Sequence, residues 1–272
     1  MASDTSQNFL ESMFYTTAGI IYHTCLCCKF YGVSRRYLST KRPLFYRRRF
    51  LISAQLAYYN CSMAKRVIAL FGGTFDPIHL GHSTVAGEAC EHIGAEKIIF
   101  VPAKRSPLKG FLPKAGDADR LKMIALAIAD NEHFQLSDYE LQRPAPSYTL
   151  QTVRHFQAEF GGETAIYWLL GTDSIEDLQH WYRIVELIDQ CNLSTMYRAG
   201  CEPPDFSKFE SIWGRQRVEK LQRNVVPTSL IDISSTEIRT RLAAGRDVSD
   251  MLHPAVADYI YSHGLYRSKA KP

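Results

Sequence analysis

The feature that most constrains the fold of this chain is a glycine-containing turn between an apolar run and an amphipathic segment. The run covers residues 67–70 and leads into FGGTFDPIHLGH, residues 71–82. Apolar β-branched residues, paired glycines, an Asp-Pro turn and an amphipathic segment indicate a strand, a loop and a helix. The glycines let a phosphate approach backbone N–H groups, and the helix start offers further donors. We therefore expect a phosphate-binding turn, with His79 and His82 on one face of the helix.

A plain structural explanation also exists, with the glycine pair as a tight turn and the two histidines on a helix surface. A lone Gly-Gly would favour it, because short glycine motifs are common by chance. The full string G-G-T-F-D-P-x-H-x-G-H is far more specific. It resembles the signature of the nucleotidyltransferases whose motif is H-x-G-H, and the TFDP at residues 74–77 makes it similar to the bacterial nicotinate-nucleotide adenylyltransferases. The resemblance covers nearly all of residues 65–267.

Strand and helix patterns alternate along the chain after residue 63. Strands are expected at residues 67–71, 97–102, 134–137, 165–170, 192–197 and 229–233, and helices at 80–92, 119–129, 147–160, 175–181, 184–189, from 233 onward and at 254–263. This order predicts an α/β fold, a Rossmann-like doubly wound and mainly parallel sheet with helices on both faces. Ligands of such sheets bind where the strands end, at the switch point. The turns after residues 71 and 170 should therefore face one crevice.

Residues 1–62 form a basic leader without sustained periodicity, which we expect to be poorly ordered and dispensable, with the nucleotidyltransferase domain at residues 63–272. The leader has a formal charge of +6, and the rest of the chain accounts for −2 of the total of +4. The net charge thus gives no reason to expect nucleic-acid binding by the domain. A mis-assigned extension starting before a natural start at Met63, a targeting segment and an interaction arm all remain open.

Composition and cysteine usage are those of an ordinary globular protein, with 46% hydrophobic and 22% charged residues. The uncharged stretch at residues 13–28 is too short and too often interrupted to span a membrane. Seven cysteines without regular spacing suit reduced thiols in the cytoplasm. Cys25-x-Cys27-Cys28 lacks the second pair that a closed zinc site needs. We expect a cytoplasmic protein with no membrane partner, no nucleic-acid partner and no metal held by protein side chains.

A second motif, ISSTEIR at residues 233–239, opens a helix with Ser and Thr at its start and Arg239 one turn later. A helix N-terminus with hydroxyl groups attracts anions, and an arginine fork binds phosphate oxygens. Taken alone, the motif is more typical of a plain N-capped surface helix with a solvated arginine. The resemblance assigns this helix start to the ATP phosphates, and the H-x-G-H histidines to the triphosphate.

A third motif, GTDS at residues 171–174, follows an apolar strand and precedes Trp181-Tyr182. An acidic residue just past a strand suits a ribose diol, although Asp173 could equally be a helix N-cap. Trp181 on its own would be taken for a core aromatic residue. In the family, the matching tryptophan stacks on the pyridine ring, and the backbone around Tyr182 and Thr149 receives the nicotinate carboxylate.

The chain departs from the family pattern at two places. At residues 102–109 it reads PAKRSPLK where the family usually has Pro-Pro-His-Lys, so Leu108 replaces a histidine while Lys109 keeps the charge. One histidine contact to the phosphates is therefore in doubt. Arg198 is followed by Ala199 where the family prefers proline, which loosens that turn.

The resemblance implies an adenylyltransferase that condenses ATP with nicotinate mononucleotide, using Mg²⁺, to nicotinate adenine dinucleotide and pyrophosphate. Alternatives are a nicotinamide-preferring enzyme, a phosphopantetheine adenylyltransferase and a catalytically silent nucleotide sensor; a homo-oligomer is left open. The candidate residues are, for catalysis, His79, His82, Lys109 and Arg239; for ATP, Gly72, Gly73, Thr74, Gly81, Asp173, Ser234, Ser235 and Thr236; and for nicotinate mononucleotide, Thr149, Trp181, Tyr182 and Arg198.

Overall fold

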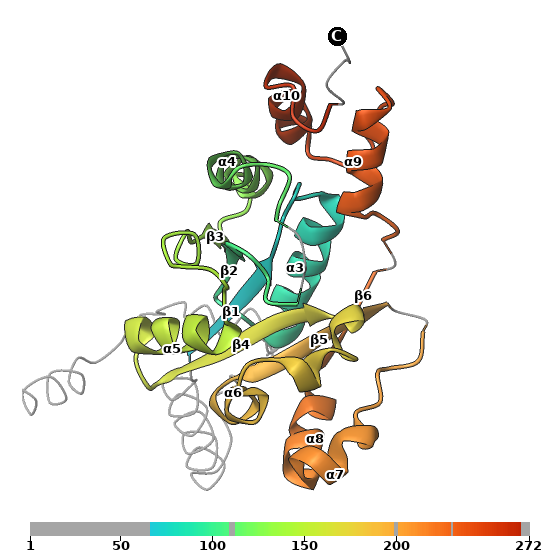
Figure 1. Cartoon of the computed structure of the whole chain (residues 1–272). Helices are drawn as coiled ribbons and strands as arrows, with labels where there is room; N and C mark the ends of the chain where they lie inside the picture. The colour runs from blue at the N-terminus through green and yellow to red at the C-terminus, as the bar shows by residue number, and fades with distance from the viewer. Residues whose placement is uncertain (1–65, 109–111, 199–200, 230, 268–272) are drawn as a thin grey trace, which may run out of the picture. The chain divides into compact units, whose positions relative to one another are not determined.

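The structure of the chain is a computed structural model that describes residues 66–108, 112–198, 201–229 and 231–267. The predicted leader at residues 1–62 lies outside this part. Six parallel strands form one sheet in the order β3-β2-β1-β4-β5-β6 (Figure 1). The strands are β1 (Arg66–Gly73), β2 (Lys97–Pro102), β3 (Phe134–Leu136), β4 (Thr164–Gly171), β5 (Asn192–Arg198) and β6 (Val225–Thr228).

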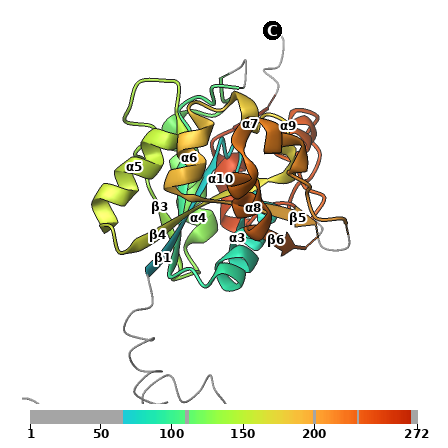
Figure 2. The same ribbon diagram turned by 90° about the horizontal axis from the view of Figure 1, so that it is seen from below.

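Helices cover both faces of this sheet (Figures 1 and 2). They are α3 (Leu80–Ile93), α4 (Asp117–Ile128), α5 (Thr149–Phe160), α6 (Ile184–Gln190), α7 (Glu210–Trp213), α8 (Arg215–Arg223), α9 (Ser235–Ala243) and α10 (Pro254–Ser262), with 3₁₀ turns η2 (Thr172–Ser174), η3 (Leu178–His180) and η4 (Ser207–Phe209). Side chains alternate along β1: Ala69 and Phe71 pack with α3, α4, α9 and α10, whereas Ile68 and Leu70 pack with α5, α6, α7 and α8. The predicted doubly wound fold is confirmed.

The strand order places the switch point between β1 and β4, at the middle of the sheet. From β1 the chain moves outward to β3 and then returns to β4 on the other side of β1. The two strands run in register, with Leu70 beside Trp168 and Phe71 beside Leu169. Their carboxyl ends therefore open at one place, which is where ligands bind in sheets of this kind.

Two predicted elements are wrong in position or type. The last strand is Val225–Thr228 rather than residues 229–233, because the β-branched Val225 and Val226 pair with β5 and the edge position tolerates Pro227. Ser229 instead donates its N–H to the Glu88 carboxylate at 2.7 Å.

The helix expected at residues 175–181 is replaced by η2 and η3. Here the backbone forms hydrogen bonds between residues three apart, from Ile175 N–H to the Thr172 carbonyl and from Trp181 N–H to the Leu178 carbonyl. Arg183 then adopts the left-handed conformation, with φ at 52°.

None of the helices in the described ranges is long and apolar enough to cross a bilayer.

Candidate active site

The glycine pair ends β1, and packing demands both glycines. A Cβ on Gly72 would lie 2.1 Å from the Trp168 ring, and one on Gly73 would lie 2.9 Å from the Phe75 ring. The core side chains therefore leave no room for a larger residue at either position. This steric reason for glycine is separate from any binding of a ligand by the N–H groups of the turn. Phe75 is itself buried with φ at 47° and forms a T-shaped pair with Phe71, at 5.5 Å between ring centroids.

The two histidines lie side by side at the start of α3, as their spacing predicts. Their ring centroids are 3.7 Å apart, and the His79 N–H donates to His82 Nδ1 at 3.2 Å. His79 is 8% exposed, and burial lowers the pKa of its imidazole to about 4. Its Nδ1 is buried without a hydrogen-bond partner among the described residues. A buried polar atom without a partner at the start of a helix calls for an explanation, and a ligand supplies one.

Gly81, between the histidines, makes room for His79. A Cβ there would lie 3.0 Å from His79 Nδ1 and 3.3 Å from the Ile231 side chain. The predicted direct contact of Gly81 with ATP remains a prediction. What the geometry adds is a steric reason for glycine at this position.

Helix α9 docks its start onto the same turn, although more than 150 residues separate the two in sequence. Ser235 Oγ donates to the Pro77 carbonyl at 2.9 Å, and Arg239 Nη1 donates to the Asp76 carbonyl at 2.7 Å. Arg239 Nη2 donates to Thr236 Oγ1 at 3.1 Å. The sequence motifs that we expected to share a site are thus adjacent in space.

Ser234 caps α9, as the plain explanation of this motif expects. Its Oγ accepts the Glu237 N–H at 3.1 Å. The hydroxyl oxygens of Ser234 and Ser235 therefore dock and cap the helix, while the N-terminal end of α9 still presents its positive dipole end beside the turn. Their contact with ATP stays a prediction.

At the end of β4, Asp173 is exposed in η2 and its Oδ1 lies where a Cβ on Gly171 would come within 2.5 Å. Asp173 is not the residue that caps this turn, since the N-cap position belongs to Gly171. An exposed carboxylate just past the carboxyl end of β4 fits the predicted contact with a ribose.

The segments predicted to read the pyridine ring meet each other. Tyr148, which precedes α5 and Thr149, packs against Tyr182 with 4.6 Å between ring centroids and the rings tilted by 35°. Tyr182 is 46% exposed. Two strand-to-helix connections, after β3 and after β4, are thus held together by an aromatic pair.

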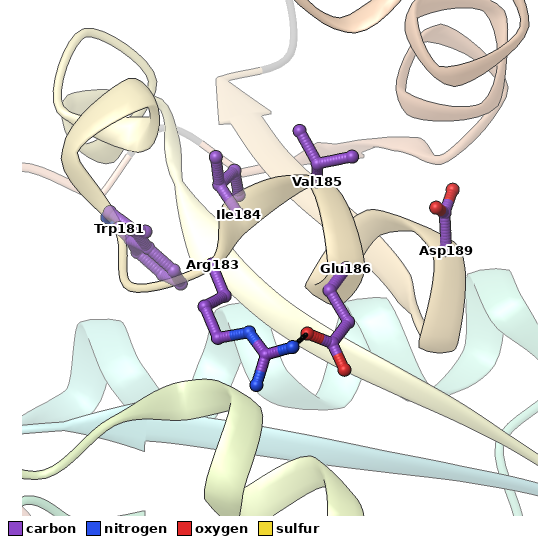
Figure 3. A pocket seen from close by; sticks show the side chains of 6 residues that line it. All are labelled: Trp181, Arg183, Ile184, Val185, Glu186 and Asp189. Atoms are coloured by element: carbon purple, nitrogen blue, oxygen red, sulfur yellow. Dashed lines mark ion pairs between the residues drawn. The ribbon is translucent and has the colours of Figure 1, made fainter.

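Trp181 also lines a hollow of ≈ 460 Å³ at the start of α6 (Figure 3). Arg183 lies there too, with Nη2 2.5 Å from Glu186 Oε2, and Glu186 pairs with Arg154 as well. The one cation that adjoins Trp181-Tyr182 in sequence is therefore already paired with a carboxylate.

Two predicted residues cannot be placed as side chains. Lys109 lies outside the described residues, and Arg198 ends β5 with only its backbone described. Leu108, which stands where the family has histidine, is 46% exposed.

Three buried charged residues support the site without having been predicted. Arg120 is fully buried on α4 and donates to the Thr74 carbonyl at 2.8 Å and to Asp117 at 2.7 Å. Its place beside Met123 and Ile124 on the apolar face of α4 is a signal that could have revealed it. Glu140 accepts from the Thr152 hydroxyl at 2.6 Å, and burial raises the pKa of its carboxyl.

The third is Asp76 in the turn itself, which is 4% exposed. Its carboxylate accepts from the N–H groups of Lys114 and Ala115 at 2.7 and 3.0 Å. It therefore fixes the loop between β2 and α4 to the turn that leads into α3. No local pattern in the sequence predicts these contacts.

Comparison with known proteins gives one consistent result. A model of the cytidylyltransferase-like family matches residues 70–241. A Clostridium botulinum (strain Okra / Type B1) protein named "Probable nicotinate-nucleotide adenylyltransferase" is 38% identical over 201 residues, 73% of this chain and 98% of that protein. A Rhodopirellula baltica protein of the same name is 32% identical over 200 residues, 74% of this chain and 93% of its own length.

Among solved structures, Plasmodium falciparum nicotinic acid mononucleotide adenylyltransferase complexed with NaAD has a TM-score of 0.58. It is 21% identical, and the match covers 74% of this chain and 97% of that one. At this identity the likeness speaks for the fold alone.

Proposed function

Because this chain belongs to the cytidylyltransferase-like family, and within it to the nicotinate-nucleotide adenylyltransferases, we propose that it joins ATP to nicotinate mononucleotide in NAD biosynthesis. The products are nicotinate adenine dinucleotide and pyrophosphate. The observation that carries the proposal is that Arg239 of α9 donates to the carbonyl of Asp76, in the turn after β1 that leads to the His79–His82 pair.

The reaction needs little covalent help from the protein. An oxygen of the nicotinate mononucleotide phosphate attacks the α-phosphorus of ATP, and the bond from that phosphorus to the bridging oxygen of pyrophosphate breaks. Negative charge builds up on the transferred and leaving phosphates, so positioning and preorganised donors do most of the catalysis. In our proposal His79, His82 and Arg239 are those donors, aided by the N-termini of α3 and α9.

His79 enters this reaction as a neutral imidazole. Its pKa of about 4 leaves the ring uncharged at neutral pH, with one nitrogen as donor and the other as acceptor. A phosphate oxygen next to the ring gives its N–H a partner. Such a donor is already desolvated and in place before charge develops, which is the condition for effective stabilisation.

We propose that Mg²⁺ arrives with ATP and is held by its phosphates. Mg²⁺ is commonly bound by substrate phosphates with at most one or two carboxylates. The described residues contain no cluster of three or more His, Cys, Asp or Glu that would hold a metal, and the Arg239 guanidinium beside the turn is a donor suited to phosphate oxygens. The bound ion would neutralise charge on the leaving pyrophosphate.

We propose that nicotinate is read by N–H donors around Thr149 and Tyr182, with Trp181 against the ring. A carboxylate accepts from such donors fully, whereas an amide brings its own NH₂ against them. Each unpaired polar group that results costs about 1–3 kcal/mol, so one or two give from about fivefold to about 10⁴-fold discrimination. The pairing of Arg183 with Glu186 supports this assignment.

We also propose that the enzyme works in the cytoplasm as a small-molecule transferase. The three described cysteines, Cys90, Cys191 and Cys201, are all free thiols, which suits a reducing compartment.

The test is product formation by the full chain with Mg²⁺, ATP and each of three acceptors: nicotinate mononucleotide, nicotinamide mononucleotide and phosphopantetheine. We expect a dinucleotide mainly from nicotinate mononucleotide. Equal efficiency with the nicotinamide compound would overturn the acceptor assignment. Product from phosphopantetheine alone, or ATP binding without any product, would assign the chain to a different activity.

A further inference from the structure

A single buried carboxylate joins distant parts of the chain beside His79. Asp76 Oδ1 accepts from Ala115 N–H and, at 2.8 Å, from the Tyr266 hydroxyl, while Oδ2 accepts from Lys114 N–H. A carboxylate this deeply buried is tolerated because donors satisfy it. Asp76 therefore ties the turn after β1 to the loop before α4 and to the segment that follows α10.

The guanidinium of Arg239 belongs to the same group of contacts. Nη1 donates to the Asp76 carbonyl and lies 4.0 Å from Asp76 Oδ2, and Nη2 donates to Thr236. Two nitrogens are thus committed, so the plane of the guanidinium is set by the position of Asp76. Its remaining N–H groups can face an anion only while Asp76 stays in place.

Tyr266 is the donor to Asp76 that comes from farthest along the chain, 190 residues away. Its φ of 61° lies in the left-handed region, which a bulky residue seldom adopts. Strained residues persist where their surroundings hold them, and they concentrate at functional sites. Burial and the Asp76 charge raise the pKa of the Tyr266 hydroxyl, so this hydroxyl keeps its proton and remains a donor.

We propose that Tyr266 is a positioning residue for ATP: through Asp76 it holds Arg239 in the orientation that binds the phosphates. The inference rests on the proposed function for the identity of the anion. Tyr266 itself contacts Asp76 and no reacting atom. A hydroxyl that merely anchored the C-terminal segment would contribute to stability and leave ATP binding unchanged, which is the contrast that the experiment uses.

The test replaces Tyr266 with Phe in the full chain, which deletes the hydroxyl and keeps the ring. Tyr259→Phe is the matched control, because the Tyr259 hydroxyl donates to Asp119 at 2.9 Å in the same C-terminal part of the chain. In Y266F we expect the Kd of a non-hydrolysable ATP analogue, measured by calorimetry, and the KM for ATP to rise about tenfold or more. The KM for nicotinate mononucleotide should stay within about twofold, and Y259F should match the parent in all three.

The route through Arg239 is tested by a double-mutant cycle with Arg239→Lys. Lysine keeps the charge but loses the planar fork that Asp76 orients. Removing the Tyr266 hydroxyl from R239K should therefore change ATP affinity by less than about twofold. Additive losses, unchanged ATP affinity in Y266F, or equal rises in KM for both substrates would overturn the proposal.

A second variant removes the acceptor of the Tyr266–Asp76 hydrogen bond instead of its donor. Asp76→Asn removes one acceptor oxygen, and it takes the place of Y266F if that variant does not fold. We expect the same loss of ATP affinity, with the KM for nicotinate mononucleotide unchanged.

A parent chain that binds the analogue but makes no dinucleotide refutes the proposed reaction, while the calorimetry still decides the role of Tyr266. A parent chain that does not bind the analogue overturns both.

Discussion

The buried state of His79 predicts a specific loss of stability in mild acid. Burial holds the pKa of the folded chain's imidazole at about 4, whereas the unfolded chain has the ordinary value of 6.5. As the pH falls below 6.5 the unfolded state takes up a proton that the folded state refuses. The stability due to His79 is therefore complete above pH 6.5 and is lost as the pH falls toward 4.

The size of this loss follows from the two pKa values. Their separation corresponds to about 3 kcal/mol once both states are protonated, and to about 2 kcal/mol at pH 5. The free energy of urea unfolding should be measured at pH 7.5 and pH 5 for the parent, for His79→Gln and for the control His155→Gln. The fall between the two pH values should be about 2 kcal/mol smaller in H79Q than in the parent.

His155→Gln is the control for this comparison. It makes the same His-to-Gln change at a partly exposed position on α5. H155Q should show the parent's fall. A bound triphosphate favours the protonated ring, so saturating ATP should restore part of the parent's stability at pH 5. Equal falls in H79Q and the parent would refute the placement of a buried neutral histidine at this turn.

Three further predictions concern the enzyme in solution. A chain that begins at Met63 should keep kcat and both KM values within about twofold, by pyrophosphate release, and a loss of most activity would show that residues 1–62 matter for chemistry. Arg239→Ala should lower kcat/KM for ATP about 10²- to 10³-fold, while Arg241→Ala, which removes a surface pair with Glu237 on the same helix, should stay near the parent. The ratio of kcat/KM for nicotinate over nicotinamide mononucleotide should change little with added salt; a collapse would point to a charged reader of the carboxylate.

Much of the fold was predictable because its signals are local. Each of the central strands β1, β2 and β4 contains an unbroken apolar run, which is typical of strands covered on both faces. The glycine turn after β1 indicates the first crossover to a helix. The pairing of His79 with His82 follows from a spacing of three. Val225–Thr228 was missed because a short edge strand containing proline has a weak pattern, and its identity depends on pairing with β5.

The supporting contacts of the site were not predictable for a related reason. Asp76 and Arg120 act on backbone groups of segments that are far away in sequence, and such contacts leave no periodicity. For Arg120, its position on the apolar face of a helix is the one sequence feature that indicates a buried charge. The role of Tyr266 becomes visible only when its hydroxyl is found against a buried carboxylate.

The most direct test of the account is label transfer from ATP by the full chain. With nicotinate mononucleotide and Mg²⁺, a label at the α-phosphorus should appear in the dinucleotide and a label at the γ-phosphorus in pyrophosphate. Both transfers should fall about 10²-fold or more in His82→Ala and Arg239→Ala and persist in H155Q. No labelled dinucleotide from the parent, or equal transfer by all four proteins, would contradict an adenylyl-transfer site at the ends of β1 and β4.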